Sequence, residues 1–150
     1  MKSAWTMEDV KRANDRAHAG WGRGSPTPHR EVPAGHNITP VPKPRMTRRD
    51  VWLHPPRPAV KRYREFADQC RIARLTLPDA DAHVLFVLPM PESWSTKKKG
   101  QMDGTPHQAK PDLSNLLKAL EDAVHPHDER IWRYGSIRKI WGRYGRIEIS

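Results

Sequence analysis

The segment 110–122 holds the side chains of this chain that are best suited to chemistry. It reads Lys-Pro-Asp-Leu-Ser-Asn-Leu-Leu-Lys-Ala-Leu-Glu-Asp. An α-helix advances about 100° per residue, so the apolar residues gather on one stripe while Asn115, Lys118 and Asp122 share the other side. The proline before Asp112 favours an extended backbone, which predicts Asp112 at or near the helix cap. An amide, an ammonium group and two carboxylates therefore line one polar face.

Two interpretations fit this polar face. In the first, Asp112 is a cap, and Lys118 and Asp122 form an ordinary surface pair one turn apart. The second includes Asp128 and Glu129, which follow the helix at the start of the next element. Carboxylates that converge from two elements suit Mg²⁺, which binds hard oxygen ligands together with water and substrate phosphate. A nearby lysine stabilises negative charge at a phosphate or helps to activate water.

The composition indicates a polyanionic partner. Lys and Arg number 27 against 17 Asp and Glu, a formal net charge of +10 that is spread along the chain. Such a charge steers a protein toward polyanions, and nucleic acid is the commonest of these. A basic protein that binds RNA without preference for branched substrates is an alternative from a different functional class. Hydrophobic residues are 36% of the chain, which predicts a small core.

Several classes of protein are disfavoured. The single cysteine, Cys70, cannot form an internal disulfide bond. No apolar run approaches the length of about 20 residues that a membrane helix needs. The first ten residues mix polar and charged side chains, unlike a signal peptide. We therefore expect a cytoplasmic protein without a membrane partner.

The chain divides into an N-terminal extension and one domain. Residues 1–36 are rich in Gly and Pro, which is typical of an arm or linker, and residues 37–150 carry the periodic segments. We expect, in order, a short edge strand in 37–45, a helix at 58–75, a buried strand at 82–88, a long loop at 89–111, a helix at 112–124, and strands at 130–141 and 146–149. The last two strands are joined by a turn at 142–145.

Basic clusters flank these elements. Lys43, Arg45 and Arg48 lie together in the segment before the first helix, and Lys97, Lys98 and Lys99 lie at the centre of the long loop. Each cluster fits either a solvated loop or a phosphate contact.

Two stretches of sequence carry a family resemblance. The stretch from Leu88, Leu-Pro-Met-Pro-Glu-Ser-Trp-Ser-Thr-Lys-Lys-Lys-Gly, and the segment 110–123 resemble the motifs of RusA-type Holliday junction resolvases, especially the phage-encoded branch. That family has Pro-x-Ser-Trp followed by lysines, and then Lys-Pro-Asp-Leu-Asp-Asn-Leu-x-Lys-x-x-x-Asp-Ala. The stretch 127–131 resembles the family's Asp-Asp-Ser-Gln-Val. The resemblance covers roughly 37–149, is specific in 88–131, and leaves residues 1–36 unexplained.

The resemblance implies a site residue by residue. The family's first catalytic aspartate falls on Asp112, its lysine on Lys118 and its helix-end aspartate on Asp122. The aspartate after the helix falls on Asp128, or on Glu129 with a shift of one residue. Asp112, Lys118 and Asp128 would then be catalytic. The metal ligands would be Asp112, Asp122, Asp128 and Glu129, with Ser114 and Asn115 supporting them. The residues expected to contact DNA are Lys43, Arg45, Arg48, Lys97, Lys98, Lys99 and Lys110.

The resemblance also implies the reaction, the partners and the fold. Family members are homodimers that cut four-way DNA junctions with Mg²⁺, and Mn²⁺ is an expected substitute. Metal-activated water would hydrolyse a phosphodiester bond. Together with the elements above, the resemblance predicts an α+β fold, with two helices packed on a small mixed or antiparallel sheet of about four strands.

One position departs from the family pattern. The family has a second essential aspartate two residues after the first, and this chain has Ser114 there. A hydroxyl group is a poorer metal ligand than a carboxylate. Either Asp122 or Glu129 makes up the missing charge, or metal binding is weakened, or the chain is a nuclease-inactive protein that binds DNA junctions. Of these we expect retained nuclease activity.

Overall fold

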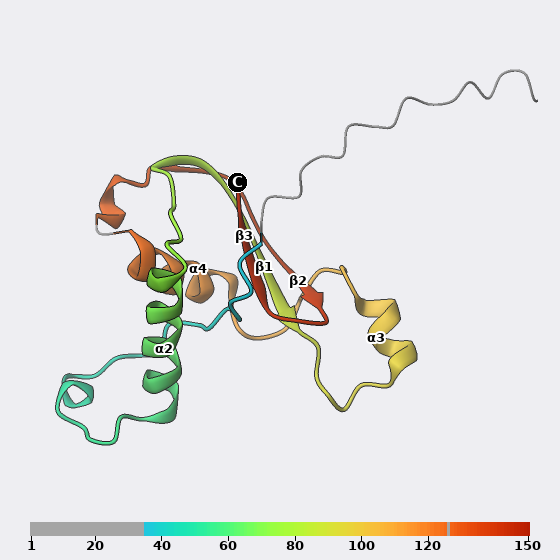
Figure 1. The fold of residues 1–150 in the computed structure, drawn as a ribbon, viewed down its shortest axis with the longest axis horizontal. Coiled ribbons are helices and arrows are strands. Elements are labelled where there is room, and N and C mark those ends of the chain that lie inside the picture. Colours follow the sequence, from blue (N-terminus) through green and yellow to red (C-terminus); the bar gives the residue numbers. More distant parts are fainter. Residues whose placement is uncertain (1–34, 126) are drawn as a thin grey trace, which may run out of the picture. The chain divides into compact units, whose positions relative to one another are not determined.

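The computed structural model describes residues 35–125 and 127–150 (Figure 1). The N-terminal arm expected for residues 1–36 therefore lies almost entirely outside the described residues. The remaining chain forms an α+β fold, as expected from the sequence. Its elements, in chain order, are η1 (Arg48–Val51), α2 (Pro58–Ile72), β1 (Ala80–Pro89), α3 (Thr96–Met102), α4 (Leu113–Val124), η2 (Asp128–Arg130), β2 (Arg133–Gly142) and β3 (Arg146–Ile149).

A mixed sheet of three strands, in the order β2-β1-β3, organises the domain. β1 pairs with β2 in parallel and with β3 in the antiparallel sense. The short turn at 142–145 favours a hairpin between β2 and β3, but β1 lies between them. Neighbouring strands lie about 4.8 Å apart, so the turn has to span only about 10 Å to cross the end of β1. β1 occupies the centre because Val84, Phe86, Val87 and Leu88 are all buried.

Short bridges extend both edges of the sheet in place of a fourth strand. On the β2 edge, Pro106 bridges Ile140, and on the β3 edge His36 bridges Ile147. The expectation of an edge strand in 37–45 is therefore wrong, because the only bridge on this edge among the described residues is made by His36, one residue before that range. Prolines at positions 40, 42 and 44 lack the N–H group that a longer ladder would need.

Helices α2 and α4 pack together on one face of the sheet, where both were expected. Fully buried side chains from α2 (Phe66), α4 (Leu116, Leu120), β1 (Phe86) and β3 (Ile147) meet in one core. Burying side chains of this size stabilises the fold by about 1.5–3 kcal/mol each. α4 therefore has a buried stripe that fixes which of its faces is presented to solvent.

The segment 89–111 contains a helix that the sequence pattern did not reveal. α3 begins after Ser95, whose hydroxyl oxygen accepts a hydrogen bond from the backbone N–H of Lys98 at 3.3 Å. None of the residues of α3 is buried, so its sequence has no apolar stripe with the helical period that would predict a helix. Figure 1 places α3 beside the end of the sheet where β2 turns into β3. In the part of the chain that the structure describes, no helix is long and apolar enough to cross a membrane.

Candidate active site at the start of helix α4

Asp112 is the N-cap residue of α4, as its position after a proline predicted. Its backbone is extended (φ −68°, ψ 143°), and its carbonyl oxygen accepts the first helical hydrogen bonds, from the N–H groups of Asn115 and Leu116. Within the described residues its side chain makes no capping hydrogen bond, and the residue is exposed. The carboxylate thus stands at the positive end of the helix dipole, open to a ligand from solvent.

Lys139 of β2 holds the turn that leads into Asp112. Its ammonium group donates hydrogen bonds to the carbonyl oxygens of Ala109 at 2.7 Å and Pro111 at 2.6 Å. The Lys139 carbonyl oxygen in turn accepts from the backbone N–H of His107 at 3.1 Å. Hydrogen bonds from a charged donor are about twice as strong as neutral ones. The position of Asp112 therefore depends on β2 as well as on its own helix.

The first two turns of α4 carry three further polar residues, Ser114, Asn115 and Lys118. Ser114 and Lys118 are exposed and lie one turn apart on the same face. Asn115 is half-buried, and its backbone carbonyl oxygen accepts from the N–H of Lys43 at 3.0 Å. Lys118 lies six residues after Asp112, or about 9 Å along the helix axis.

Asp122 is engaged elsewhere. Its carboxylate pairs with the ammonium group of Lys43 at 2.5 Å and accepts a hydrogen bond from the hydroxyl group of Tyr63 at 2.9 Å. Burial, helped by this bond to Asp122, raises the pKa of Tyr63 to about 12. Asp122 follows Asp112 by ten residues, or about 15 Å along the helix axis. The helix therefore keeps these two carboxylates apart.

Asp128 and Glu129 lie in η2, beyond the C-terminal end of α4 (Figure 1). Both are exposed, and the carboxylate of Glu129 lies 3.4 Å from His127 Nδ1. Among the described residues, no group of three or more His, Cys, Asp or Glu side chains is placed to hold a metal ion. Within the described part of the chain, the four carboxylates expected as ligands do not converge as a set.

Most of the chain matches one known protein family. The family model described as "Endodeoxyribonuclease RusA" matches residues 37–150. The chain belongs to the RusA endodeoxyribonuclease family. No curated protein and no solved structure gives a significant match. Membership supports an endonuclease that acts on Holliday junctions and therefore on DNA.

In this RusA family member, the start of α4 combines features suited to phosphate chemistry. Asp112 offers a solvent-accessible carboxylate, Ser114 offers a hydroxyl group in place of the family's second carboxylate, and Lys118 offers a positive charge. Compared with the family pattern, the site therefore has one negative charge fewer. Oxygen donors at the surface, with nearby positive charge, can hold a hydrated divalent cation and a phosphate together.

The expected DNA contacts lie on different sides of this RusA domain. Lys97, Lys98 and Lys99 lie on α3, where the ammonium group of Lys98 stands 4.2 Å from the centre of the Trp94 ring. Arg45 and Arg48 lie in the segment around η1, on the far side of the sheet from α3 in Figure 1. Lys110 is exposed beside Asp112. A bound DNA would have to be large enough to reach from α3 to η1 in order to meet both clusters.

An ion pair between the buried Asp50 and the exposed Arg57 fixes the η1 cluster. Asp50 is only 2% exposed, and its carboxylate accepts hydrogen bonds from the guanidinium group of Arg57 and from the backbone N–H of Thr47. Arg57 also donates to the carbonyl oxygen of Arg45 at 2.9 Å. The Arg57 guanidinium, followed by Thr47, holds the pKa of Asp50 well below its usual range.

Sequence reasoning missed three residues that position the candidate site. Lys139 anchors the turn before Asp112, and Tyr63 binds Asp122. Asp79 holds the far end of α4, because its carboxylate lies 2.9 Å from His125 Nε2 and 3.1 Å from an Arg130 guanidinium nitrogen. The one available signal was for Lys139, which lies on the same face of its strand as two apolar residues, Ile137 and Trp141.

Proposed function

We propose that this protein is a Mg²⁺-dependent, structure-selective endodeoxyribonuclease that resolves four-way DNA junctions by hydrolysing phosphodiester bonds. The observation that carries the proposal is the exposed carboxylate of Asp112 at the start of α4, in a RusA-family chain of net charge +10. Lys139 holds the turn that precedes it through the carbonyl oxygens of Ala109 and Pro111. The proposed setting is the cytoplasm of a bacterial or phage-infected cell, during DNA recombination or repair.

The residues at the start of α4 fit a hydrated magnesium ion. Mg²⁺ commonly keeps several waters and binds proteins through one or two carboxylates together with substrate phosphate. Asp112 supplies one such carboxylate, and the hydroxyl group of Ser114 can accept or donate a hydrogen bond at a metal-bound water. The bound metal would activate water and neutralise phosphate charge. Mn²⁺, which takes similar oxygen ligands, should replace Mg²⁺.

The chain's own residues have separate proposed roles in holding the ion, stabilising the transition state and binding DNA. Asp112 would hold the ion, and Lys118 would place a positive charge where the phosphate gains negative charge in the transition state. Asp128 and Glu129 are proposed as further carboxylates at the site, and they can take this role only if DNA or a second copy brings η2 toward Asp112. Lys97, Lys98 and Lys110 contact the DNA backbone and orient the strand.

A homodimer is proposed as the active form. A four-way junction has two symmetrically related strands to be cut, and a dimer with two-fold symmetry presents one active site to each. Both sites would then lie on one basic surface. Sedimentation of the protein with and without a junction would show whether two copies bind each junction.

Cleavage of a synthetic four-way junction tests the proposed function. The wild-type protein with Mg²⁺ should cut the junction and leave a linear duplex of the same length intact, and Asp112→Asn should reduce cutting by at least about 100-fold. Asp68→Asn, which removes an exposed carboxylate from α2, is the matched control and should cut normally. Equal cutting by the wild type and Asp112→Asn would refute the assignment of the site.

Ser114 favours a second candidate function, a nuclease-inactive protein that binds junctions. This candidate predicts tight, salt-sensitive junction binding without any cleavage. Ser114→Asp would restore the family's second carboxylate two residues after Asp112. Cutting by Ser114→Asp but not by the wild type would establish the second candidate. Cutting by the wild type would exclude it.

A further inference from the structure

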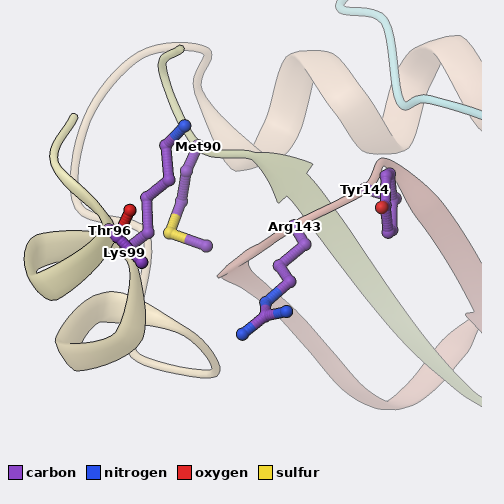
Figure 2. Close-up of a pocket in the computed structure, with 5 residues that line it drawn as sticks. All are labelled: Met90, Thr96, Lys99, Arg143 and Tyr144. Atoms are coloured by element: carbon purple, nitrogen blue, oxygen red, sulfur yellow. The ribbon is translucent and has the colours of Figure 1, made fainter. Parts of the chain in front are cut away.

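The turn between β2 and β3 projects an aromatic side chain between two hollows. Tyr144 is 79% exposed. One hollow, of about 340 Å³, is lined by Met90, Thr96, Lys99, Arg143 and Tyr144 (Figure 2). The other, of about 460 Å³, is lined by Asn37, Thr39, Pro89, Arg143, Tyr144 and Gly145. Arg143 and Tyr144 line both hollows, and the two hollows together with these side chains are called the turn groove below.

Close packing on both sides of the turn explains why its two large side chains point outward. A β-carbon at Gly142 would collide with the side chain of Val87, and one at Gly145 would collide with Thr39. The backbone is therefore pressed against β1 and the segment before η1, which leaves Arg143 and Tyr144 to project toward solvent. The exposed ring of Tyr144 is therefore accessible to a ligand from solvent.

The charges in the turn groove are available to an anion. Figure 2 shows the Arg143 side chain reaching from the turn into the space that faces α3, with Met90 and Lys99 on the opposite side. Among the described residues, the nearest carboxylate to Arg143 is that of Asp103, 3.9 Å away, and the Arg143 side chain remains 71% exposed. The ammonium group of Lys99 contacts only a neutral group among the described residues, the carbonyl oxygen of Glu92 at 3.3 Å. The positive charges of Arg143 and Lys99 are therefore only weakly neutralised by the described residues.

We propose that the turn groove binds an unpaired stretch of a DNA strand, with a base stacked on Tyr144 and phosphates held by Arg143 and Lys99. Alternation of cations with an exposed aromatic ring is the chemistry of sites for single-stranded nucleic acid. The bases of an intact duplex are already stacked on each other, so they cannot stack on Tyr144 without being opened. The groove would therefore favour DNA with unpaired bases over continuous duplex.

This assignment rests on the proposed function and deepens it, because strand exchange points are where a junction opens most easily. The groove also lies within reach of the candidate active site. Lys139, which anchors the turn before Asp112, precedes Gly142 on β2 by three residues, or about 10 Å. A strand seated in the groove can therefore continue toward Asp112, so that recognition of unpaired bases would position the neighbouring phosphate for cleavage.

Fluorescence anisotropy without a divalent metal tests the groove separately from catalysis. The probes are a labelled single-stranded oligonucleotide, a four-way junction and a blunt duplex of the same length. Tyr144→Ala should weaken binding to the single strand and the junction by about 5- to 150-fold. It should weaken binding to the duplex by less than about 2-fold, because a duplex leaves no base free to stack. Tyr144→Phe, which keeps the ring, should bind like the wild type.

Trp132→Ala is the matched control for loss of an exposed aromatic side chain. Trp132 is 70% exposed and precedes β2, so the length of the strand separates it from Tyr144. The control should leave all three affinities unchanged. Equal losses in Tyr144→Ala and Trp132→Ala, or equal losses on duplex and single strand, would overturn the proposal. An effect of Tyr144→Ala on RNA but not on DNA of the same sequence would also overturn it.

Salt dependence tests the cations. Arg143→Ala should reduce the slope of log K against log salt concentration for single-stranded DNA by about 0.7, the value expected for one lost phosphate contact. Arg71→Ala removes an exposed arginine of α2 that pairs with Asp68, and it should leave the slope unchanged. An unchanged slope in Arg143→Ala would contradict the phosphate contact. Failure of Asp112→Asn to reduce cleavage would refute the proposed function without affecting these binding results.

Discussion

Replacing Lys139 with methionine separates positioning of Asp112 from DNA binding. Methionine keeps most of the length of the side chain but cannot donate the hydrogen bonds to the carbonyl oxygens of Ala109 and Pro111. A hydrogen bond from a charged donor contributes about 1.5–3 kcal/mol when buried. Because Lys139 is only half-buried, we take about 2 kcal/mol for the pair, which corresponds to a decrease of about 30-fold in kcat.

The assay is cleavage of a four-way junction at saturating and limiting DNA concentrations. Lys139→Met should lower kcat by about 30-fold while KM for the junction changes less than about 3-fold, because Lys139 does not lie in the turn groove. Lys139→Arg, which can still donate, should recover much of kcat. Lys61→Met removes an exposed lysine of α2, and it is the control for general loss of charge. An unchanged kcat, or a rise in KM alone, would refute the positioning role.

Three further results are expected. Removal of divalent metal with a chelator should abolish cleavage and leave junction binding within about 2-fold, since phosphate contacts supply most of the affinity. Asp50→Asn should destabilise the protein near pH 7. Because the pKa of Asp50 is lowered in the folded state, its ionised carboxylate stabilises the fold above the ordinary carboxyl pKa, and this stabilisation is lost as the pH falls below that value. The free energies of urea unfolding of the two proteins should therefore converge toward pH 2. Burial, followed by the hydrogen bond to Asp122, raises the pKa of the Tyr63 phenol to about 12. In a pH titration followed by ultraviolet absorbance, Tyr63→Phe should therefore lose one phenol that ionises near pH 12.

The local elements were predictable where one face is buried. The helix expected at 58–75 occupies Pro58–Ile72, and the helix expected at 112–124 occupies Leu113–Val124 with Asp112 as its cap. Both have apolar residues that recur with the helical period and form the core. α3 was missed because it buries none of its residues, so its sequence carries no such period.

The pairing of strands was less predictable because it depends on contacts between distant residues. A short turn normally joins hairpin partners, whereas here β1, which carries the buried core residues Val84, Phe86 and Leu88, separates β2 from β3. The same limit applies to the candidate site. Asp122 meets Tyr63 across 59 positions of sequence, and Lys139 reaches Pro111 across 28. The spacing within 110–122 predicted a polar face, but it could not predict which of those side chains already have partners.

The location of a bound metal ion tests the central claim most directly. Crystals of the protein with a four-way junction and Mn²⁺ would reveal the metal by its anomalous scattering. Our account predicts a peak within coordination distance of the Asp112 carboxylate, at the start of α4, and beside a phosphate of the bound DNA. A peak at Asp128 and Glu129 without Asp112, or no peak near Asp112 in crystals that cleave their DNA, would contradict it.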